Sequence, residues 1–578
     1  MEEHTPGKLE SKEKTVRWNW PSFLADREEQ VFLLLTLVIG AIVGATVVAF
    51  ILLTQRFGAR IYAGREAAAW PRLVIPVLGS LAMGYLLFRF FPYARGSGVP
   101  QTKAALYARE GHISLRTVLG KFFCTSATLA SGIPLGREGP SVQVGAGIAS
   151  VLGRKLGLRP EKVKALIPVG AAAAVAAAFN TPLAAVLFAL EEVVGDLHAP
   201  VLGSVVLASA TSWAVLRVLL GNAPLFKVPE YQLIHPIELV AYAVLGIAGG
   251  IVSAAFSRLL LWLRKQFLQL PRKTLWFQPV AGGLVVGAMG WFVPQILGVG
   301  YGQVGEALNG ELALKVMVLL LVLKFFAVIA SYSSGNAGGI FGPSLFLGAM
   351  LGGIVGTSAQ LILPGYIGKP GAYALVGMGT AFAGIVRAPM TSVVMIFETT
   401  RDYAVIVPLM ISNLLSFFIS ARLQPRPIYE ELARQDGIHL PGEEPHASVG
   451  RMPIVSLLRP AAEVLDSTLP ISAALETLRA GKHRALPVRS TRGLEGMASV
   501  DLLQKEVQDG PARLLLEVLP KSDFPHIHRD HTLAQALDRM AAARLDVLPV
   551  VSRANIRELE GVVMLRDVLN RYGISVKE

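Results

Sequence analysis

Long uncharged apolar segments dominate the first 430 residues of the chain and become rare after that point. The earliest, residues 31–54, has 24 residues without a charged side chain. This length is enough to cross about 30 Å of hydrocarbon with some tilt, and it exceeds the roughly 7–15 apolar residues of a secretory signal peptide. We therefore predict a first membrane helix here, after a polar segment at 1–30. Further apolar segments lie near residues 73–91, 117–133, 164–192, 199–220, 237–263, 278–297, 313–331, 340–363, 372–399 and 404–421.

Glycine and proline interrupt several of these segments. Backbone that is broken at membrane depth needs protein or an aqueous cavity to satisfy its N–H and C=O groups. Paired interruptions in two halves of a chain point to the binding site of a transporter. The interruptions lie at Gly96–Pro100, Gly132–Pro140, Asn180–Pro182, Gly338–Pro343 and Arg387–Pro389.

Two parts of the membrane region repeat each other. Residues 169–192 align without gaps on residues 376–399 at an offset of 207, with seven identical positions, among them a proline and a glutamate. A shorter match, at an offset of 203, joins residues 139–145 to 342–348. We predict two related halves and favour an inverted arrangement, although the alignment does not distinguish inverted from parallel halves. Their limits are about 31–220 and 237–421.

The chain becomes polar near residue 430, and a second, shorter repeat follows a linker at 435–449. Its most regular feature is the tripeptide Leu-Pro-Val, at 486–488 and again at 548–550, an offset of 62. Each unit of this repeat is expected to form a helix, a short strand, a turn, a second strand and a helix. The sequence thus predicts a small α/β domain at 450–578, with units of about 450–508 and 515–575.

Composition and charge agree with this division. The chain is 53% hydrophobic and 16% charged, against about 25% charged in soluble domains, which excludes a wholly soluble or disordered protein. Residues 1–429 carry a net charge of +15 and residues 430–578 carry −2. The basic excess fits cytoplasmic loops and would also suit anionic cargo. A single cysteine, Cys124, excludes an intramolecular disulfide framework and a cysteine-based metal cluster.

Three of the interruptions have the chemistry of an anion site. An anion that crosses lipid must be compensated for lost hydration, but a full positive charge would trap it. Helix N-termini offer free N–H groups and about half a positive charge, glycine permits close approach of the backbone, and proline at a helix start sacrifices no hydrogen bond. The predicted filter residues are Gly96, Ser97, Gly98, Val99, Pro100, Gly136, Arg137, Glu138, Gly139, Pro140, Gly339, Ile340, Phe341, Gly342 and Pro343.

These three motifs in this order, with the internal repeat and Tyr429 downstream, resemble the signature of the CLC family of chloride channels and chloride/proton exchangers. The C-terminal repeat resembles a pair of CBS motifs. The resemblance covers about 31–434 and implies an all-α polytopic membrane domain of two repeated halves with broken and re-entrant helices. It also implies a cytosolic α/β CBS pair, cytoplasmic N- and C-termini, contact with membrane lipid, and a homodimer with one pathway per subunit.

The same resemblance implies the chloride ligands. Ser97 and Tyr429 would each offer a hydroxyl to a central chloride, and Ile340 and Phe341 would offer backbone N–H groups. Serine in the first motif accompanies chloride preference in the family, whereas proline accompanies nitrate. Two plainer interpretations remain open: Ser97 as a helix N-cap, and Tyr429 as an interfacial aromatic residue. Lys121 matches a basic residue of the family and could add to the field near the site.

Glu138 is the candidate gate. A charge at membrane depth costs about 2.5–3.5 kcal/mol on insertion scales, so a carboxylate there is a functional hypothesis by default. It can occupy the anion pathway itself, and protonation would remove its charge and admit chloride. The family assigns this role to the matching glutamate. The alternative is a simple salt bridge with Arg137.

Two consecutive carboxylates end the segment 164–192. Glu191 recurs as Glu398 in the second half, which favours a structural role at a helix end. Glu192 has Thr399 opposite, and many exchangers of the family carry a glutamate here that relays protons from the cytoplasm. Glu192 therefore favours exchange over channel activity, with a solvated helix end beside Asp196 as the alternative.

Adenine nucleotides bind many CBS pairs, but the pattern here is incomplete. In the second unit Asp567 matches the acid that holds the ribose, whereas Met564 replaces a hydroxyl residue. In the first unit Ser499 is present and Asp501 comes one residue early. Nucleotide binding at Asp567 thus stays open beside structural coupling between subunits.

The sequence favours a chloride/proton antiporter with regulatory CBS domains, and its nearest rival is a passive voltage- or pH-gated chloride channel of the same fold. A divalent-cation channel would need acidic pore residues, yet no aspartate lies within 164–192 or 372–399. An intramembrane metalloprotease would need HExxH, which does not occur. We therefore expect no enzyme activity, no required cofactor or metal, and no nucleic-acid partner, with chloride and protons as the transported species.

Overall fold

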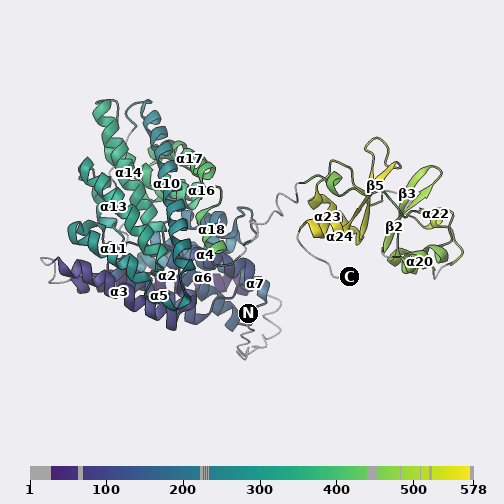
Figure 1. The fold of residues 1–578 in the computed structure, drawn as a ribbon, viewed down its shortest axis with the longest axis horizontal. Helices are drawn as coiled ribbons and strands as arrows, with labels where there is room; N and C mark the ends of the chain where they lie inside the picture. Colours follow the sequence, from purple (N-terminus) through teal and green to yellow (C-terminus); the bar gives the residue numbers. More distant parts are fainter. Residues whose placement is uncertain are drawn as a thin grey trace. The chain divides into compact units, whose positions relative to one another are not determined.

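The computed structural model describes residues 28–572, apart from residues 63–68, 222–225, 227, 229–230, 232, 439, 441–449, 451, 482, 508–509 and 520–523. The chain divides into two compact units, Met1–Leu440 and Pro441–Glu578. Figure 1 shows the first unit as helices and the second as helices and strands. The predicted fold class, a helical membrane domain followed by a small α/β domain, is confirmed.

The helices of the first unit fall into two series of the same order. The first series comprises α2 (Glu28–Tyr62), α3 (Trp70–Arg89), α4 (Val99–Ala108), α5 (Leu115–Ala130), α6 (Glu138–Lys155), α7 (Pro160–Phe179), α8 (Pro182–Phe188) and α9 (Leu202–Leu220). The second comprises α10 (Glu238–Gln269), α11 (Pro279–Phe292), α12 (Tyr301–Leu308), α13 (Leu314–Ser333), α14 (Phe341–Ile362), α15 (Pro370–Val386), α16 (Pro389–Thr400) and α17 (Ile406–Leu423). A short helix, α18 (Ile428–Gln435), follows.

Packing repeats along with this order. Helix α2 packs against α9 as α10 packs against α17, and α6 packs against α7 as α14 packs against α15. The last two contacts are very close: a Cβ at Gly145 would lie 2.3 Å from the carbonyl oxygen of Gly170, and a Cβ at Gly348 would lie 2.1 Å from that of Gly377. Only glycine permits these helix crossings, and it occupies equivalent positions in both halves.

Eight helices among the described residues are long and apolar enough to cross a membrane. The predicted breaks also occur. Asn180, with a φ of 60°, ends α7 before Pro182 begins α8, and Arg387, with a φ of 72°, ends α15 before Pro389 begins α16. The hydrophobic pattern of the sequence did not reveal α4, α6 or α12. Helices α4 and α6 bury many small and polar residues inside the protein, whereas α12 has only eight residues and is partly exposed.

The two halves meet at a pair of equivalent glycines. Gly136 and Gly339 form an isolated antiparallel bridge in which each N–H donates to the other's carbonyl oxygen at 2.7 Å. These residues are 203 positions apart, the offset of the repeat. Since each residue pairs with its own counterpart, an approximate two-fold axis passes between them.

The second unit contains two small α/β modules (Figure 1). The first has β1 (Leu465–Asp466), α20 (Ile471–Ala480), β2 (Ala485–Ser490), β3 (Gly493–Ser499), α21 (Val500–Val507) and α22 (Leu515–Val518), with β1 parallel and β3 antiparallel to β2. The second has α23 (Leu533–Ala543), β4 (Val547–Val551), β5 (Leu559–Met564) and α24 (Leu565–Arg571), with β4 antiparallel to β5. The order of helix, strand, strand and helix agrees with the sequence-based expectation. The sequence also suggested that the first strand of each unit ends at Leu-Pro-Val, whereas β2 and β4 both continue beyond this tripeptide.

Candidate ion-transport site

The three glycine- and proline-rich motifs converge in the first unit. A Cβ at Gly98 would lie 2.3 Å from the carbonyl oxygen of Gly139, so the first and second motifs touch through backbone alone. Gly98 also has a φ of +105°, a conformation that favours glycine. The pairing of Gly136 with Gly339 joins the second motif to the third. The motifs therefore bring together the N-termini of α4, α6 and α14.

Ser97 and Tyr429 contribute two buried hydroxyl groups to this region. Ser97 precedes α4, and Tyr429 lies in the first turn of α18, which packs against α4. Neither hydroxyl has a hydrogen-bond partner of normal geometry among the described residues, and the Ser97 side chain lies close enough to the Tyr429 phenol to interact with it. A buried hydroxyl without a partner costs about 1–3 kcal/mol. Two such donors side by side fit an anion that accepts from both.

Ile340 and Phe341 form the start of α14, the helix that follows the third motif. Ile340 is the N-cap residue and Phe341 the first helical residue, and both are fully buried. The Phe341 ring packs at 4.3–5.5 Å, between ring centroids, against three other phenylalanines. This packing fixes the helix start, whose first N–H groups have no acceptor within the helix.

The Glu138 carboxylate occupies this helix start. Glu138 is the first residue of α6 and is fully buried. Its Oε2 accepts the Gly342 N–H at 3.2 Å, and its Oε1 accepts a hydrogen bond from the phenol of Tyr301. The Nε of Arg137 lies 3.9 Å from Oε1. A simple salt bridge with Arg137 therefore does not describe this residue, because the two hydrogen bonds come from other elements.

Glu192 is buried rather than solvated. It lies in the π-helical turn Ala189–Val194 that follows α8, and its Oε1 accepts from Lys103 Nζ at 3.0 Å. The side chains of Lys103 and Glu192 are 11% and 6% exposed. The alternative of a solvated helix end beside Asp196 is thus wrong.

Glu191 has the structural role expected from the repeat. Its carboxylate accepts the N–H groups of Met390 at 3.1 Å and Thr391 at 2.8 Å, at the start of α16. Glu398 does the same for α8, where it accepts from Leu183 and Ala184 at 2.9 and 2.7 Å. Each half therefore caps a broken helix of the other half.

Lys121 supports the backbone of the first motif. Its ammonium is fully buried and donates to the carbonyl oxygens of Ala94 at 2.9 Å and Gly96 at 2.5 Å. In the second half, Lys324 donates to Ile296 at 2.9 Å and Gly298 at 2.6 Å. Lys121 thus binds the loop before α4, and Lys324 binds the equivalent loop before α12.

The repeat separates these residues into two kinds. The contacts of Gly136 with Gly339, Lys121 with its loop and Glu191 with its helix all recur in the other half. Other polar groups occur in one half only. The offsets of 202 to 207 identify the equivalent positions in the other half. These are Phe341 for Glu138, Thr399 for Glu192, Gly305 for Lys103, and Val99 for Tyr301.

Sequence reasoning missed Tyr301 and Lys103. A signal for Tyr301 was present, since Gly298 and Gly300 precede it as Gly96 and Gly98 precede Val99, and all four glycines have positive φ. For Lys103 the sequence offered no signal, because its partner Glu192 is 89 residues away.

Asp567 lines a cavity of about 400 Å³ in the second unit, but its carboxylate is engaged. Arg459 lies 2.7 Å from Asp567 Oδ2 through Nε and donates through Nη2 to Oδ1 at 2.8 Å. A nucleotide ribose at this position would have to displace the guanidinium.

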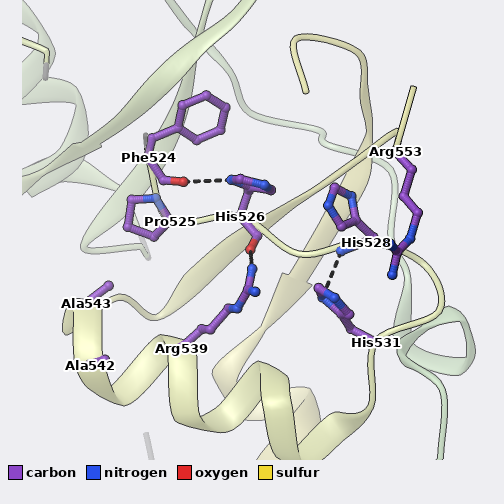
Figure 2. A pocket seen from close by; sticks show the side chains of 9 residues that line it. All are labelled: Phe524, Pro525, His526, His528, His531, Arg539, Ala542, Ala543 and Arg553. Atoms are coloured by element: carbon purple, nitrogen blue, oxygen red, sulfur yellow. Dashed lines mark hydrogen bonds between the residues drawn. The ribbon is translucent and has the colours of Figure 1, made fainter. Parts of the chain in front are cut away.

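A larger cavity of about 670 Å³ lies beside α23 and is lined by three histidines (Figure 2). Their Nδ1 atoms are engaged by backbone: His526 with Phe524 O at 2.7 Å, His528 with Val551 O at 2.9 Å, and His531 with the N–H of His528 at 3.2 Å. Burial, together with the nearby Arg539, lowers the pKa of His531. Within the described part of the chain no three histidine, cysteine, aspartate or glutamate residues are grouped for a metal ion.

A helical membrane unit that gathers broken helix starts around a buried carboxylate and unpaired hydroxyls has the architecture of an anion-transport protein. The chain belongs to the voltage gated chloride channel family, whose profile matches residues 79–421. A CBS domain profile matches residues 516–573. The resemblance to the CLC family with an appended CBS region is therefore confirmed.

Curated relatives carry related names. The chain is 32% identical over 431 residues to the H(+)/Cl(-) exchange transporter ClcA of Salmonella arizonae, which covers 71% of this chain and 91% of that relative. It is also 32% identical, over 366 residues, to ClcA of Vibrio campbellii, with 62% and 78% covered. A putative chloride channel protein, ClcB-like, of Ralstonia nicotianae is 32% identical over 381 residues, with 64% and 88% covered.

Solved structures share the fold. The crystal structure of a slow cyanobacterial Cl-/H+ antiporter matches with a TM-score of 0.65 and 27% identity, covering 70% of this chain and 97% of that one. A eukaryotic CLC transporter matches with a TM-score of 0.63 and 22% identity, covering 94% and 99%. The second likeness concerns the fold alone.

Proposed function

We propose that this protein exchanges chloride for protons across a membrane. The observation that carries the proposal is the position of the Glu138 carboxylate on the N-terminus of α14, where it accepts the Gly342 N–H. A helix start that holds a carboxylate can also hold a halide, because both are anions and accept from the same N–H groups. Chloride and the carboxylate therefore compete for one position. Protonation of Glu138 removes its charge and admits chloride, so one side chain links the two movements.

Ser97 and Tyr429 hold chloride on the other side of Glu138 in this proposal. Their hydroxyls are buried and have no partner within the described chain, so an anion between them would satisfy both. The starts of α14 at Ile340 and Phe341 add N–H donors. Hydroxyl and amide donors carry only partial charges, which lets chloride bind without being trapped.

Glu192 is the proposed inner end of the proton path, and it is the reason to favour exchange over a passive chloride channel. It is a buried carboxylate whose cationic partner among the described residues is Lys103, and its electrostatic influence reaches Tyr429. The relatives named exchange transporters support the same conclusion. A passive channel of the same fold is the outcome that a proton measurement would reveal.

The test uses the full chain reconstituted into liposomes with a chloride gradient. We expect chloride efflux to drive proton uptake in the wild type. Glu138→Ala should conduct chloride without proton uptake, and Glu192→Gln should lose proton uptake more than chloride flux. Glu306→Gln, which changes an exposed carboxylate on α12, is the control and should behave as the wild type. Chloride flux without proton movement in the wild type would establish a channel, and coupled transport in Glu138→Ala would refute the gate.

Several finer features belong to the same proposal. We infer that both termini and the CBS region are cytoplasmic, that residues 435–449 link the two domains, and that the protein is a lipid-embedded homodimer that performs transport rather than catalysis. The family resemblance supports these points, and cysteine labelling from each side of the membrane with cross-linking of the purified protein tests them.

Regulation by an adenine nucleotide at Asp567 needs Arg459 to move, because the guanidinium engages the carboxylate. We therefore expect nucleotide binding to be weak in the wild type and stronger in Arg459→Ala. Calorimetric titration of the full chain with ATP and AMP tests this. Equal binding by both proteins would place a nucleotide elsewhere.

A further inference from the structure

Tyr301 makes the one side-chain hydrogen bond that the described residues offer to Glu138, and no sequence motif predicted it. The phenol stands at the first position of α12 and donates to Glu138 Oε1. We propose that Tyr301 is a positioning residue that holds the Glu138 carboxylate in the anion site and thereby sets how easily chloride displaces it. This inference rests on the proposed exchange function and adds to it a residue that tunes the gate.

The phenol is held in place by its surroundings. Its ring packs edge-on against Phe226, with centroids 5.5 Å apart, and the Arg137 guanidinium lies 5.4 Å from the ring centroid. Behind it, Gly300 has a φ of +90°, and a Cβ there would lie 2.7 Å from the Phe346 ring. The direction of the hydroxyl thus follows from the backbone at the start of α12.

The loop does not need a phenol for its own structure. In the other half the equivalent position at the start of α4 is Val99, preceded by the same pair of positive-φ glycines. Glu138 is likewise not repeated in the other half, where the equivalent residue is Phe341. Donor and acceptor are therefore both additions to the repeated scaffold, and each occurs in the one half where it can meet the other.

Among the described residues, few charged or titratable groups surround Glu138. Arg137 of the preceding loop lies 3.9 Å away, and Tyr301 comes from α12. Helix α14 contributes the Gly342 N–H, and Tyr429 of α18 interacts with Glu138 electrostatically. Lys324 of α13 lies behind the α12 loop, where its ammonium binds the Gly298 carbonyl. Removal of the Tyr301 hydroxyl takes away a direct hydrogen bond to Glu138 and changes neither the net charge nor the backbone.

Removal of the Tyr301 hydroxyl should make the Glu138 carboxylate a weaker competitor of chloride for the anion site. A hydrogen bond to a charged acceptor is worth roughly a tenfold change in an equilibrium or more. The bond stabilises the ionised, seated form of Glu138. In Tyr301→Phe the seated carboxylate is therefore held less firmly, and chloride binds up to roughly tenfold more tightly at neutral pH. Because chloride then competes with a weaker occupant, chloride flux should persist to higher pH than in the wild type.

The experiment uses the full chain in detergent for calorimetric chloride titration and in liposomes for chloride and proton flux between pH 4.5 and 8. Tyr301→Phe keeps the ring, so the packing is preserved. The matched control is Tyr373→Phe, which removes another buried tyrosine–glutamate contact, that of Tyr373 with Glu238 at 3.4 Å. The same tyrosine change is also made in Glu138→Ala.

We expect the pH profile of chloride flux and the chloride affinity to shift in Tyr301→Phe and to stay unchanged in Tyr373→Phe. In the Glu138→Ala background, the Tyr301→Phe change should shift neither quantity. If Tyr301→Phe leaves chloride affinity and the pH profile unchanged while Glu138→Ala loses proton coupling, this inference is overturned and the exchange mechanism remains intact. A shift that persists without Glu138 would overturn it too, since the hydroxyl would then act elsewhere. Coupled transport in Glu138→Ala would instead refute the proposed function itself.

Discussion

Lys103 and Glu192 form a buried ion pair of 3.0 Å across 89 residues of sequence. Burial of two charges is expensive, and an ion pair offsets that cost only while both partners are present. The pair also occurs in one half of the repeat only, because Gly305 and Thr399 stand at the equivalent positions. These facts distinguish it from the repeated contacts of the scaffold and connect it to the proposed proton path.

Replacement of Lys103 should therefore reduce proton transport more than chloride transport. In Lys103→Met the buried Glu192 carboxyl loses the cation that stabilises its ionised form, so it should relay protons poorly. We expect proton uptake to fall roughly tenfold or more, with a smaller effect on chloride flux, in the liposome assay. Lys103→Arg restores the charge and should recover most of the coupling. An equal loss of both fluxes in Lys103→Met would instead indicate a damaged fold.

Glu191 and Glu398 should contribute to stability and not to coupling. Each accepts two backbone N–H groups from the helix start of the opposite half. Glutamine keeps one acceptor oxygen and loses the charge, so each Glu→Gln variant should lose about 1–3 kcal/mol of stability. Thermal unfolding of the detergent-solubilised chain, followed by tryptophan fluorescence, measures this.

The two glutamine variants should be destabilised to a similar extent, and their ratio of protons to chloride should equal that of the wild type. Glu306→Gln is again the control. An altered ratio in Glu191→Gln would contradict the purely structural role.

Gly98 should not accept a side chain. A Cβ there would lie 2.3 Å from the Gly139 carbonyl oxygen, and the φ of +105° is strained for alanine. We expect Gly98→Ala to lose about 2–4 kcal/mol of stability and to bind chloride more weakly, because the first two motifs would separate.

The control is Gly302→Ala on α12, where an added Cβ meets nothing within 4 Å. Calorimetric chloride titration and thermal unfolding check both variants. Unchanged chloride binding in Gly98→Ala would show that the contact between the motifs does not shape the anion site.

Much of the membrane unit was predictable because its local chemistry is distinctive. Uncharged runs of sufficient length indicated the lipid-facing helices, and the prolines at 182 and 389 indicated where two of them break. The uncharged runs did not indicate α4, α6 or α12. The first two motifs marked the starts of α4 and α6, whose small and polar residues are mostly buried in the protein, whereas α12 has only eight residues and is partly exposed.

The candidate site divides in the same way. The three motifs, Glu138 and Glu192 were visible because glycine, proline and isolated carboxylates in apolar sequence are unusual in themselves. The partners of those carboxylates were not visible. Tyr301 and Lys103 are ordinary residues locally, and they acquire a role only because the start of α12 lies beside Glu138 and the middle of α4 lies beside Glu192.

The amino-acid sequence alone determined that this is a duplicated membrane protein with helix starts suited to an anion and acids suited to a proton, since these properties depend on composition and short-range backbone geometry. Only the tertiary structure decided that Gly136 meets Gly339, that each half caps the other's helix, and which donor holds each acid. Those contacts join residues about 90 to 215 positions apart. Their energies arise from side chains and backbone that become neighbours after the two halves have packed, and no local pattern carries that information.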